Sequence, residues 1–194
     1  MKMKKIAIIG PSGSGKSTLA RDLGSILHIK VYHLDPYFWK PGWVERPRQE
    51  RIKILHGLVR GVQWIIEGTY FTTSDMRLKE ADTIIFLDMS RWLCFKRVIQ
   101  RYMSYRKHRQ PRPDLPDACP EKLGVHYCVK ILLFWFIGRR TIVPKLKEID
   151  PEKIIALHSP EEVKNFLNGL KQPARETEHS PLSAHIAREK VLVS

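Results

Sequence analysis

The sequence has few cysteines and no long apolar run. Its three cysteines, Cys94, Cys119 and Cys128, are odd in number and lack the spacing of a metal site, so neither a disulfide framework nor a zinc site is indicated. The longest apolar stretch, Ile131–Gly138, is far shorter than the roughly 20 residues of a transmembrane helix. The apolar part of the N-terminal MKMKKIAIIG is too short for an export signal, because a Gly-Pro pair follows it. We therefore expect a cytoplasmic protein without a membrane partner.

Acidic residues are also scarce. There are 20 Asp and Glu against 34 Lys and Arg, which gives a formal net charge of +14. This excess favours anionic partners, which composition leaves open as phosphometabolites, nucleic acid or a membrane surface. It is regional, because residues 91–112 hold eight basic residues and no acid, whereas 114–121 are acidic and rich in proline. Length and the 43% apolar composition indicate one ordinary globular domain.

Five near-continuous apolar runs, bounded by turn signals, are typical of buried parallel strands. They are Lys5–Ile9, Val31–Leu34, Trp64–Glu67, Thr83–Asp88 and Lys153–Leu157. Amphipathic segments alternate with them. They predict helices over Lys16–Leu27, Arg48–Arg60, Arg91–Tyr105 and from Pro160 onward, the last opened by a capping box. The sequence therefore predicts an α/β fold with a parallel sheet flanked by helices.

The segment 105–149 interrupts this alternation. Its first half, RKHRQPRPDLPDACPEK, has the prolines and charge of a surface excursion, so a lid is predicted over about 105–125. A helix with a very apolar end is predicted over Glu121–Ile137. From residue 172 the chain becomes polar and aperiodic, which predicts a flexible tail over 172–194 after one domain of residues 1–171.

The strongest motif lies between the first predicted strand and helix. Residues 10–17 read GPSGSGKS and match GxxxxGK[ST] in the required context. Glycines here let backbone N–H groups turn inward and cradle phosphate oxygens at the positive end of the helix. We expect this loop to bind ATP, with Lys16 on the β- and γ-phosphates and Ser17 on Mg²⁺. The predicted nucleotide-binding residues are Gly10, Ser12, Gly13, Ser14, Gly15, Lys16, Ser17 and Thr18.

Acidic residues end three of the predicted strands, where ligands of open α/β sheets bind. Asp35 is either a functional acid or a turn former before Pro36. As a functional acid it would take an acceptor's proton or hold a metal-bound water. Glu67 is either an acid near Mg²⁺ or a capping residue. Asp88 resembles the acid of a Walker B motif, but its place before a helix favours a cap.

Aromatic and arginine clusters complete the candidate site. Residues 37–43, YFWKPGW, are either a hydrophobic plug or the wall of an acceptor pocket. Arg97 and Arg101 share a predicted helix face and are expected at the nucleotide. Arg106, Arg109 and Arg112 fall on the predicted lid, where closing guanidinium groups would stabilise charge on the transferred phosphoryl group. Further candidates are Arg77, Arg139 and Arg140.

Together with the phosphate-binding loop, several strings resemble one family. They are YHLD at 32–35, FWKPGW at 38–43, EGTY at 67–70, RL at 77–78, AD at 81–82, and FLD at 86–88 followed by RWLC at 91–94. Over about residues 4–170 the chain resembles the bacterial adenylate-kinase-related proteins often labelled topology modulation proteins. The resemblance implies a nucleoside-monophosphate-kinase-like P-loop fold with strand order 2-3-1-4-5, ATP at the P-loop and a lid. The family commonly has aspartate where this chain has Glu67.

These features predict an ATP-dependent kinase. It would transfer the γ-phosphate of Mg·ATP to a small-molecule acceptor bound near Asp35, with Lys16, Asp35, Arg106, Arg109 and Arg112 as catalytic residues and Ser17 and Glu67 at the metal. The alternative is an ATP-modulated DNA-binding regulator that uses the basic residues 91–112, or a kinase of polynucleotide ends. The sequence leaves the acceptor and the oligomeric state open.

Overall fold

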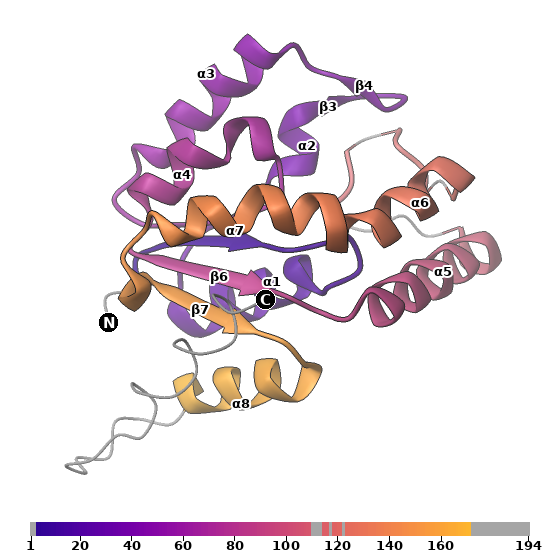
Figure 1. The fold of residues 1–194 in the computed structure, drawn as a ribbon. Helices are drawn as coiled ribbons and strands as arrows, with labels where there is room; N and C mark the ends of the chain where they lie inside the picture. Colours follow the sequence, from indigo (N-terminus) through magenta and orange to yellow (C-terminus); the bar gives the residue numbers. More distant parts are fainter. Residues whose placement is uncertain (1–2, 110–113, 117, 122, 172–194) are drawn as a thin grey trace.

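The structure, a computed structural model, describes residues 3–109, 114–116, 118–121 and 123–171, with the backbone alone at 126 and 130. Its centre is a five-stranded sheet in the order β2-β5-β1-β6-β7, with all neighbours parallel (Figure 1). The strands are β1 (Lys5–Ile9), β2 (Val31–His33), β5 (Trp64–Glu67), β6 (Thr83–Leu87) and β7 (Ile154–Leu157). Counted along the chain within this sheet, the order is the predicted 2-3-1-4-5. The α/β fold is therefore confirmed.

Helices connect the strands in the alternation that parallel pairing requires. They are α1 (Lys16–Leu27), α2 (Leu34–Phe38), α3 (Arg48–Val59), α4 (Ser74–Glu80), α5 (Arg91–His108), α6 (Val125–Leu133), α7 (Arg139–Lys147) and α8 (Pro160–Lys171). Short helical turns are η1 (Phe71–Thr73), the π-helical η2 (Phe134–Gly138) and η3 (Pro151–Lys153). A two-stranded ribbon pairs β3 (Trp39–Lys40) with β4 (Val44–Glu45).

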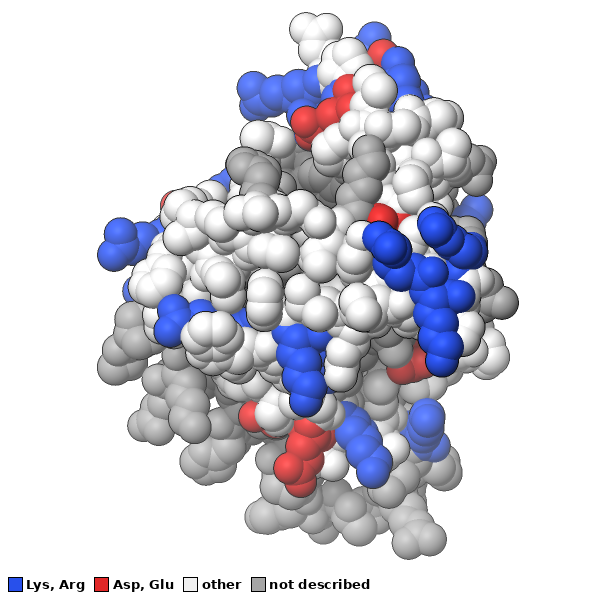
Figure 2. Space-filling view, turned by 90° about the vertical axis from the view of Figure 1, so that its right-hand side faces the viewer, with Lys and Arg blue, Asp and Glu red and all other residues white. Residues whose placement is uncertain are grey.

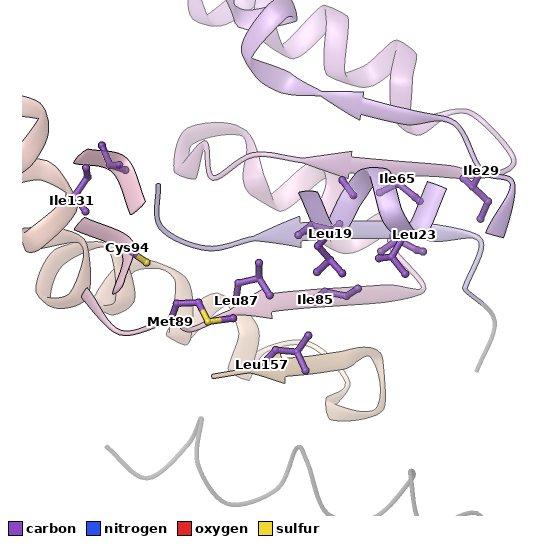
Figure 3. Close-up of a cluster of buried hydrophobic side chains, with 14 residues drawn as sticks. Leu19, Leu23, Ile29, Ile65, Ile85, Leu87, Met89, Cys94, Ile131 and Leu157 are labelled. Atoms are coloured by element: carbon purple, nitrogen blue, oxygen red, sulfur yellow. The ribbon is translucent and has the colours of Figure 1, made fainter. Parts of the chain in front are cut away.

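The sheet is buried on both faces, because side chains alternate along each strand. Ile6 and Ile8 of β1 point into one cluster, which α1 and α5 cover and against which α8 packs (Figure 3). Ala7 and Ile9 point into the other, which α2, α3, α4 and α7 cover. The apolar runs thus form strands because both neighbouring layers take up their side chains. No helix among the described residues is long and apolar enough to cross a membrane.

The largest differences from the sequence prediction lie in 105–149. The third helix extends to His108, and the helix expected over Glu121–Ile137 begins at Val125 and continues through η2 into α7. The expected surface excursion is instead partly buried at Asp114, Leu115, Cys119 and Glu121. Arginines of neighbouring helices compensate two of its acids, since Asp114 Oδ1 lies 3.4 Å from Arg21 Nη1 and Glu121 Oε1 3.0 Å from Arg101 Nε. The predicted tail, 172–194, lies outside the described residues.

Candidate active site

The glycine-rich loop joins β1 to α1 at the carboxyl edge of the sheet. Its first residue, Gly10, has φ +150°, and a Cβ there would stand 2.6 Å from the Leu87 carbonyl oxygen of β6. Thr69, which follows β5, holds the same residue from the other side: its Oγ1 accepts from Gly10 N at 2.9 Å and donates to Gly10 O at 2.5 Å. The loop is therefore anchored between its two neighbouring strands.

Helix α5 fixes the middle of the loop. Gly13 has φ +83°, and a Cβ would lie 2.4 Å from the carbonyl oxygen of Cys94 in the first turns of α5. One helical turn further along, Arg97 Nη1 donates to the Ser14 carbonyl oxygen at 3.2 Å. Arg97 is thus brought to the phosphate-binding loop, as the sequence predicted, and only glycine fits at position 13.

Lys16, Ser17 and Glu67 meet where α1 begins and β5 ends. Lys16 Nζ donates to the Pro11 carbonyl oxygen at 2.8 Å, so its charge lies across the mouth of the loop. Ser17 Oγ donates to Glu67 Oε1 at 3.1 Å. His33 Nδ1 lies 2.9 Å from the same carboxylate oxygen, because His33 and Glu67 are partners in the register of β2 and β5.

Glu67 is ionised in spite of its burial. Burial alone would raise its pKa, but the hydrogen bond with His33, the charge of Lys16 and the hydroxyl of Ser17 together lower the pKa below the ordinary value. A serine hydroxyl beside a carboxylate is a hard-oxygen pair of the kind that Mg²⁺ prefers. Within the described residues, no three His, Cys, Asp or Glu side chains cluster as a metal site. A Mg²⁺ ion at this pair would thus take its other ligands from phosphate and water.

Asp35 is the second residue of the short helix α2 and not the end of β2, which stops at His33. Tyr70 Oη donates to Asp35 Oδ1 at 2.5 Å and accepts from Trp39 Nε1 at 2.8 Å. Burial and the charge of Asp35 raise the pKa of Tyr70 far above its usual value, so Tyr70 stays a proton donor. The carboxylate is thereby held at the same edge of the sheet as the P-loop.

Arg77 of α4 is fully buried behind this edge. Its Nη2 donates to the carbonyl oxygen of Gly68, while Nε and Nη1 lack hydrogen-bond partners within the described part of the chain. Burial lowers the pKa of Arg77 to about 10, and the negative charge of Glu67 opposes that shift. The guanidinium is therefore charged at neutral pH and supports the backbone next to Glu67.

Asp88 does not cap α5, so the favoured sequence interpretation is wrong. The helix begins after Ser90, whose side chain makes no capping hydrogen bond. The Asp88 carboxylate instead pairs with Arg139 of α7, with Oδ2 and Nη2 3.3 Å apart, and lies 3.7 Å from His158 Nδ1. Arg139 comes from a helix that the sequence did not predict. The Asp88 carboxylate pairs with its charge instead of with the backbone amides at the start of α5. A small pocket beside Pro11 is lined by Asp88 and Arg139 together with Arg91, Ile131, Phe134 and Trp135.

The remaining predicted arginines are spread along α5. Arg101 lies near its middle and pairs with Glu121. Arg106 is exposed on the last turn, where its Nη1 donates to Tyr102 Oη at 3.4 Å, and Arg109 is the exposed residue after the helix. Arg106 therefore belongs to a helix and not to a loop. Arg112 lies outside the described residues.

The aromatic segment 37–43 contains the predicted hydrophobic plug, and its role as the wall of an acceptor pocket stays a prediction. Phe38 is a buried plug in the core, whereas Trp39 reaches the hydroxyl that bonds Asp35. Trp43 links the ribbon to the 114–121 segment: its backbone N–H donates to Cys119 Sγ at 3.3 Å and its indole N–H to the Pro120 carbonyl oxygen at 2.9 Å. The thiol in turn donates to the carbonyl of Lys40 at 3.4 Å.

Sequence reasoning missed the roles of His33, Thr69, Tyr70 and Cys119. The first three had a usable signal. His33 ends β2 and Thr69 and Tyr70 follow β5, and the carboxyl ends of parallel strands share the edge at which the P-loop lies. Cys119 had none, since its partners are about 80 positions away in the chain.

Comparisons with known proteins find likenesses in structure. Comparison with family models and with curated protein sequences found no match. Shikimate kinase from Bacteroides thetaiotaomicron is 16% identical, with a TM-score of 0.53 over 88% of this chain and 97% of that one. Shikimate kinase from Acinetobacter baumannii, in complex with shikimate, is 16% identical, with a TM-score of 0.54 over 87% and 91%. The resemblance to topology modulation proteins stays a prediction. At this identity the likenesses show the fold alone, a five-stranded parallel sheet flanked by helices.

Proposed function

We propose that the protein is an ATP-dependent phosphotransferase acting on a small-molecule acceptor. The observation that carries the proposal is that a phosphate-binding loop and an oriented carboxylate lie at the same edge of the sheet. The glycine-rich loop with Lys16 and Ser17 lies beside the ionised Glu67. Asp35 accepts a hydrogen bond from Tyr70, which follows Glu67 by three positions. A phosphate cradle next to an oriented carboxylate is the arrangement that phosphoryl transfer to a hydroxyl or phosphate group needs.

The loop binds the triphosphate of ATP. Its amides and the positive end of α1 surround the phosphate oxygens, and Lys16 exchanges its bond with Pro11 for a bond to the β- and γ-phosphates. Ser17 and Glu67 would hold Mg²⁺, which would neutralise charge on the phosphate oxygens. Arg97, already bonded to the loop at Ser14, adds a second positive charge beside the nucleotide.

Asp35 takes the proton of the acceptor. The hydrogen bond from Tyr70 to Oδ1 orients this carboxylate. Trp39 orients Tyr70 in turn, so the ribbon β3–β4 contributes to the placement of the base. Arg106, Arg109 and Arg112 remain the arginines proposed to approach the transferred phosphoryl group when the last turn of α5 and the segment after it close.

An acceptor screen tests the proposal. ADP release from Mg·ATP is measured with nucleosides, nucleoside monophosphates, small hydroxy acids and oligonucleotide ends. One class should accelerate release, and Asp35→Asn should lower kcat by about 10² or more while sparing ATP binding, as the loss of a positioned base does. Asp22→Asn, at an exposed position of α1, is the matched control and should act like the wild type. Full turnover of Asp35→Asn would contradict the assignment of the base.

A further inference from the structure

The helix that runs from α6 into η2 has an apolar face exposed to solvent. Val125, Val129, Leu133 and Ile137 follow one another at four-residue spacing and therefore share a face. They are 83%, 43%, 42% and 61% exposed. The opposite face carries Ile131, which is buried in the core (Figure 3). The inner face thus packs in the core, whereas no described residue covers the outer apolar face.

Aromatic rings and arginines continue this face beside α5. Trp135 and Phe136 are 43% and 45% exposed, and Trp92 of α5 is 63% exposed. The guanidinium of Arg91 lies 5.4 Å from the centre of the Trp92 ring and 5.6 Å from that of Phe136. That of Arg139 lies 5.5 Å from the centre of Trp135. Apolar rings and positive charges thus alternate over one surface, here called the α6 face.

The charge around the α6 face is mainly positive. Neither Arg91–His108 nor Val125–Lys147 contains an acidic residue, and both contain several Lys and Arg, of which Arg140 is exposed. Asp88 pairs with Arg139 at the edge of the face. Figure 2 looks onto this end of the molecule, where Lys and Arg side chains, with a few Asp and Glu, stand around a broad area of uncharged residues. An exposed apolar stripe with tryptophan, bordered mainly by positive charge, is the composition of a helix that lies in the interface of an anionic membrane.

We infer that the α6 face binds the surface of a membrane containing anionic lipids, with the axis of α6 parallel to the bilayer. The four aliphatic side chains favour lipid over nucleic acid, because bases stack on aromatic rings and gain little from valine, leucine or isoleucine. The excess of positive charge favours lipid over a second copy of the chain, because two α6 faces would repel each other. The inference revises the expectation of no membrane partner, since Ile131–Gly138 is too short to span a bilayer but long enough to lie on one. It does not depend on the proposed activity.

Vesicle sedimentation of the full chain tests the inference. Vesicles of phosphatidylcholine alone are compared with vesicles that also contain phosphatidylglycerol, at low and at physiological salt. The wild type should sediment with the anionic vesicles at both salt concentrations and only weakly with the neutral ones. Phe136→Ser with Ile137→Ser should reduce the affinity by at least about tenfold, because two apolar side chains no longer enter the interface.

Two controls separate apolar insertion from general attraction of a basic protein. Val62→Ser removes a valine that is 82% exposed next to the amino end of β5, away from the α6 face, and should bind vesicles as the wild type does. Arg140→Gln should weaken binding to anionic vesicles and leave the weak binding to neutral ones unchanged. Thermal unfolding of each variant verifies that the fold is intact.

Three results would overturn the inference. The first is wild-type protein that stays in solution with anionic vesicles, and the second is a double serine variant that binds them as tightly as the wild type. The third is evidence for another occupant: a wild-type dimer in sedimentation equilibrium that the double variant abolishes, or single-stranded oligonucleotide binding that the double variant loses while vesicle binding persists.

Discussion

Replacing Gly13 by alanine tests how firmly α5 holds the phosphate-binding loop. The new Cβ would stand 2.4 Å from the Cys94 carbonyl oxygen and 3.0 Å from its carbonyl carbon. Both are helix backbone atoms, so no side-chain rotation can relieve the contact. The first turns of α5 would have to retreat by about 1 Å to restore ordinary van der Waals separation, and the bond between Arg97 and Ser14 would lengthen with them.

Two costs add at this position. Holding alanine at a positive φ costs about 1–2 kcal/mol, and forcing extra volume into a packed contact costs about 1–3 kcal/mol. We expect Gly13→Ala to lower the free energy of unfolding by about 3 kcal/mol. Gly42→Ala isolates the first cost, because Gly42 has φ +79° and no described atom within 4 Å of its Cβ position. Gly57→Ala, at an exposed position in the last turn of α3, should stabilise the protein by up to about 0.5–1 kcal/mol.

Urea unfolding of the three variants measures these differences, provided that the slope with urea concentration is unchanged. The expected order of stability is Gly57→Ala, wild type, Gly42→Ala and Gly13→Ala. Equal stability of the Gly42 and Gly13 variants would refute the reasoning, because it would mean that α5 does not press on the loop. The Gly13 variant should also bind ATP more weakly, since the loop and Arg97 move apart.

The lowered pKa of Glu67 should appear in the pH dependence of folding: its contribution is complete above the unfolded value of about 4.5 and disappears as the pH falls through the lower folded value. Between about pH 3 and 6 the free energy of unfolding should therefore fall more steeply with decreasing pH in the wild type than in Glu67→Gln. The same pH dependence in both proteins would contradict the ionised state. At least one alanine variant of Arg106, Arg109 and Arg112 should lower kcat by about 10² with only a few-fold change in the Kd of ATP. Arg60→Ala, at the exposed end of α3, is the control, and full turnover by all three variants would refute the proposed closure.

The sequence predicted the parts of the fold that depend on local pattern. The P-loop follows from glycine spacing, and the five strands and α1 follow from the pattern of apolar residues. Both signals lie within short stretches of the sequence. The capping box of α8 is also confirmed, since Glu162 N donates to Ser159 Oγ at 3.1 Å and His158 N to Glu162 Oε2 at 2.8 Å. These bonds join residues no more than four positions apart, so they can be inferred directly from the sequence.

Partners distant in the chain account for most of what was missed. Asp88 stands just before α5, where a capping residue is expected, but its carboxylate pairs with Arg139, some 50 residues later. Asp114 and Glu121 have the composition of a surface loop, yet arginines of α1 and α5 allow both to be buried. The bond from Tyr70 to Asp35 depends in the same way on where the segment after β5 meets α2. Ion pairs and hydrogen bonds of this kind become visible only once the elements are packed.

Calorimetric titration with Mg·ATP tests the central claim, that this loop is a nucleotide site, most directly. Wild-type protein should bind with measurable heat, and Lys16→Ala should lose most of the affinity, because the lysine's charge-assisted bonds to the β- and γ-phosphates are gone. Its unfolding temperature should stay close to that of the wild type, since among the described residues the side chain donates a hydrogen bond only to the Pro11 carbonyl oxygen. Lys53→Ala, an exposed lysine of α3, should bind as the wild type does. Unchanged affinity in Lys16→Ala would contradict the account.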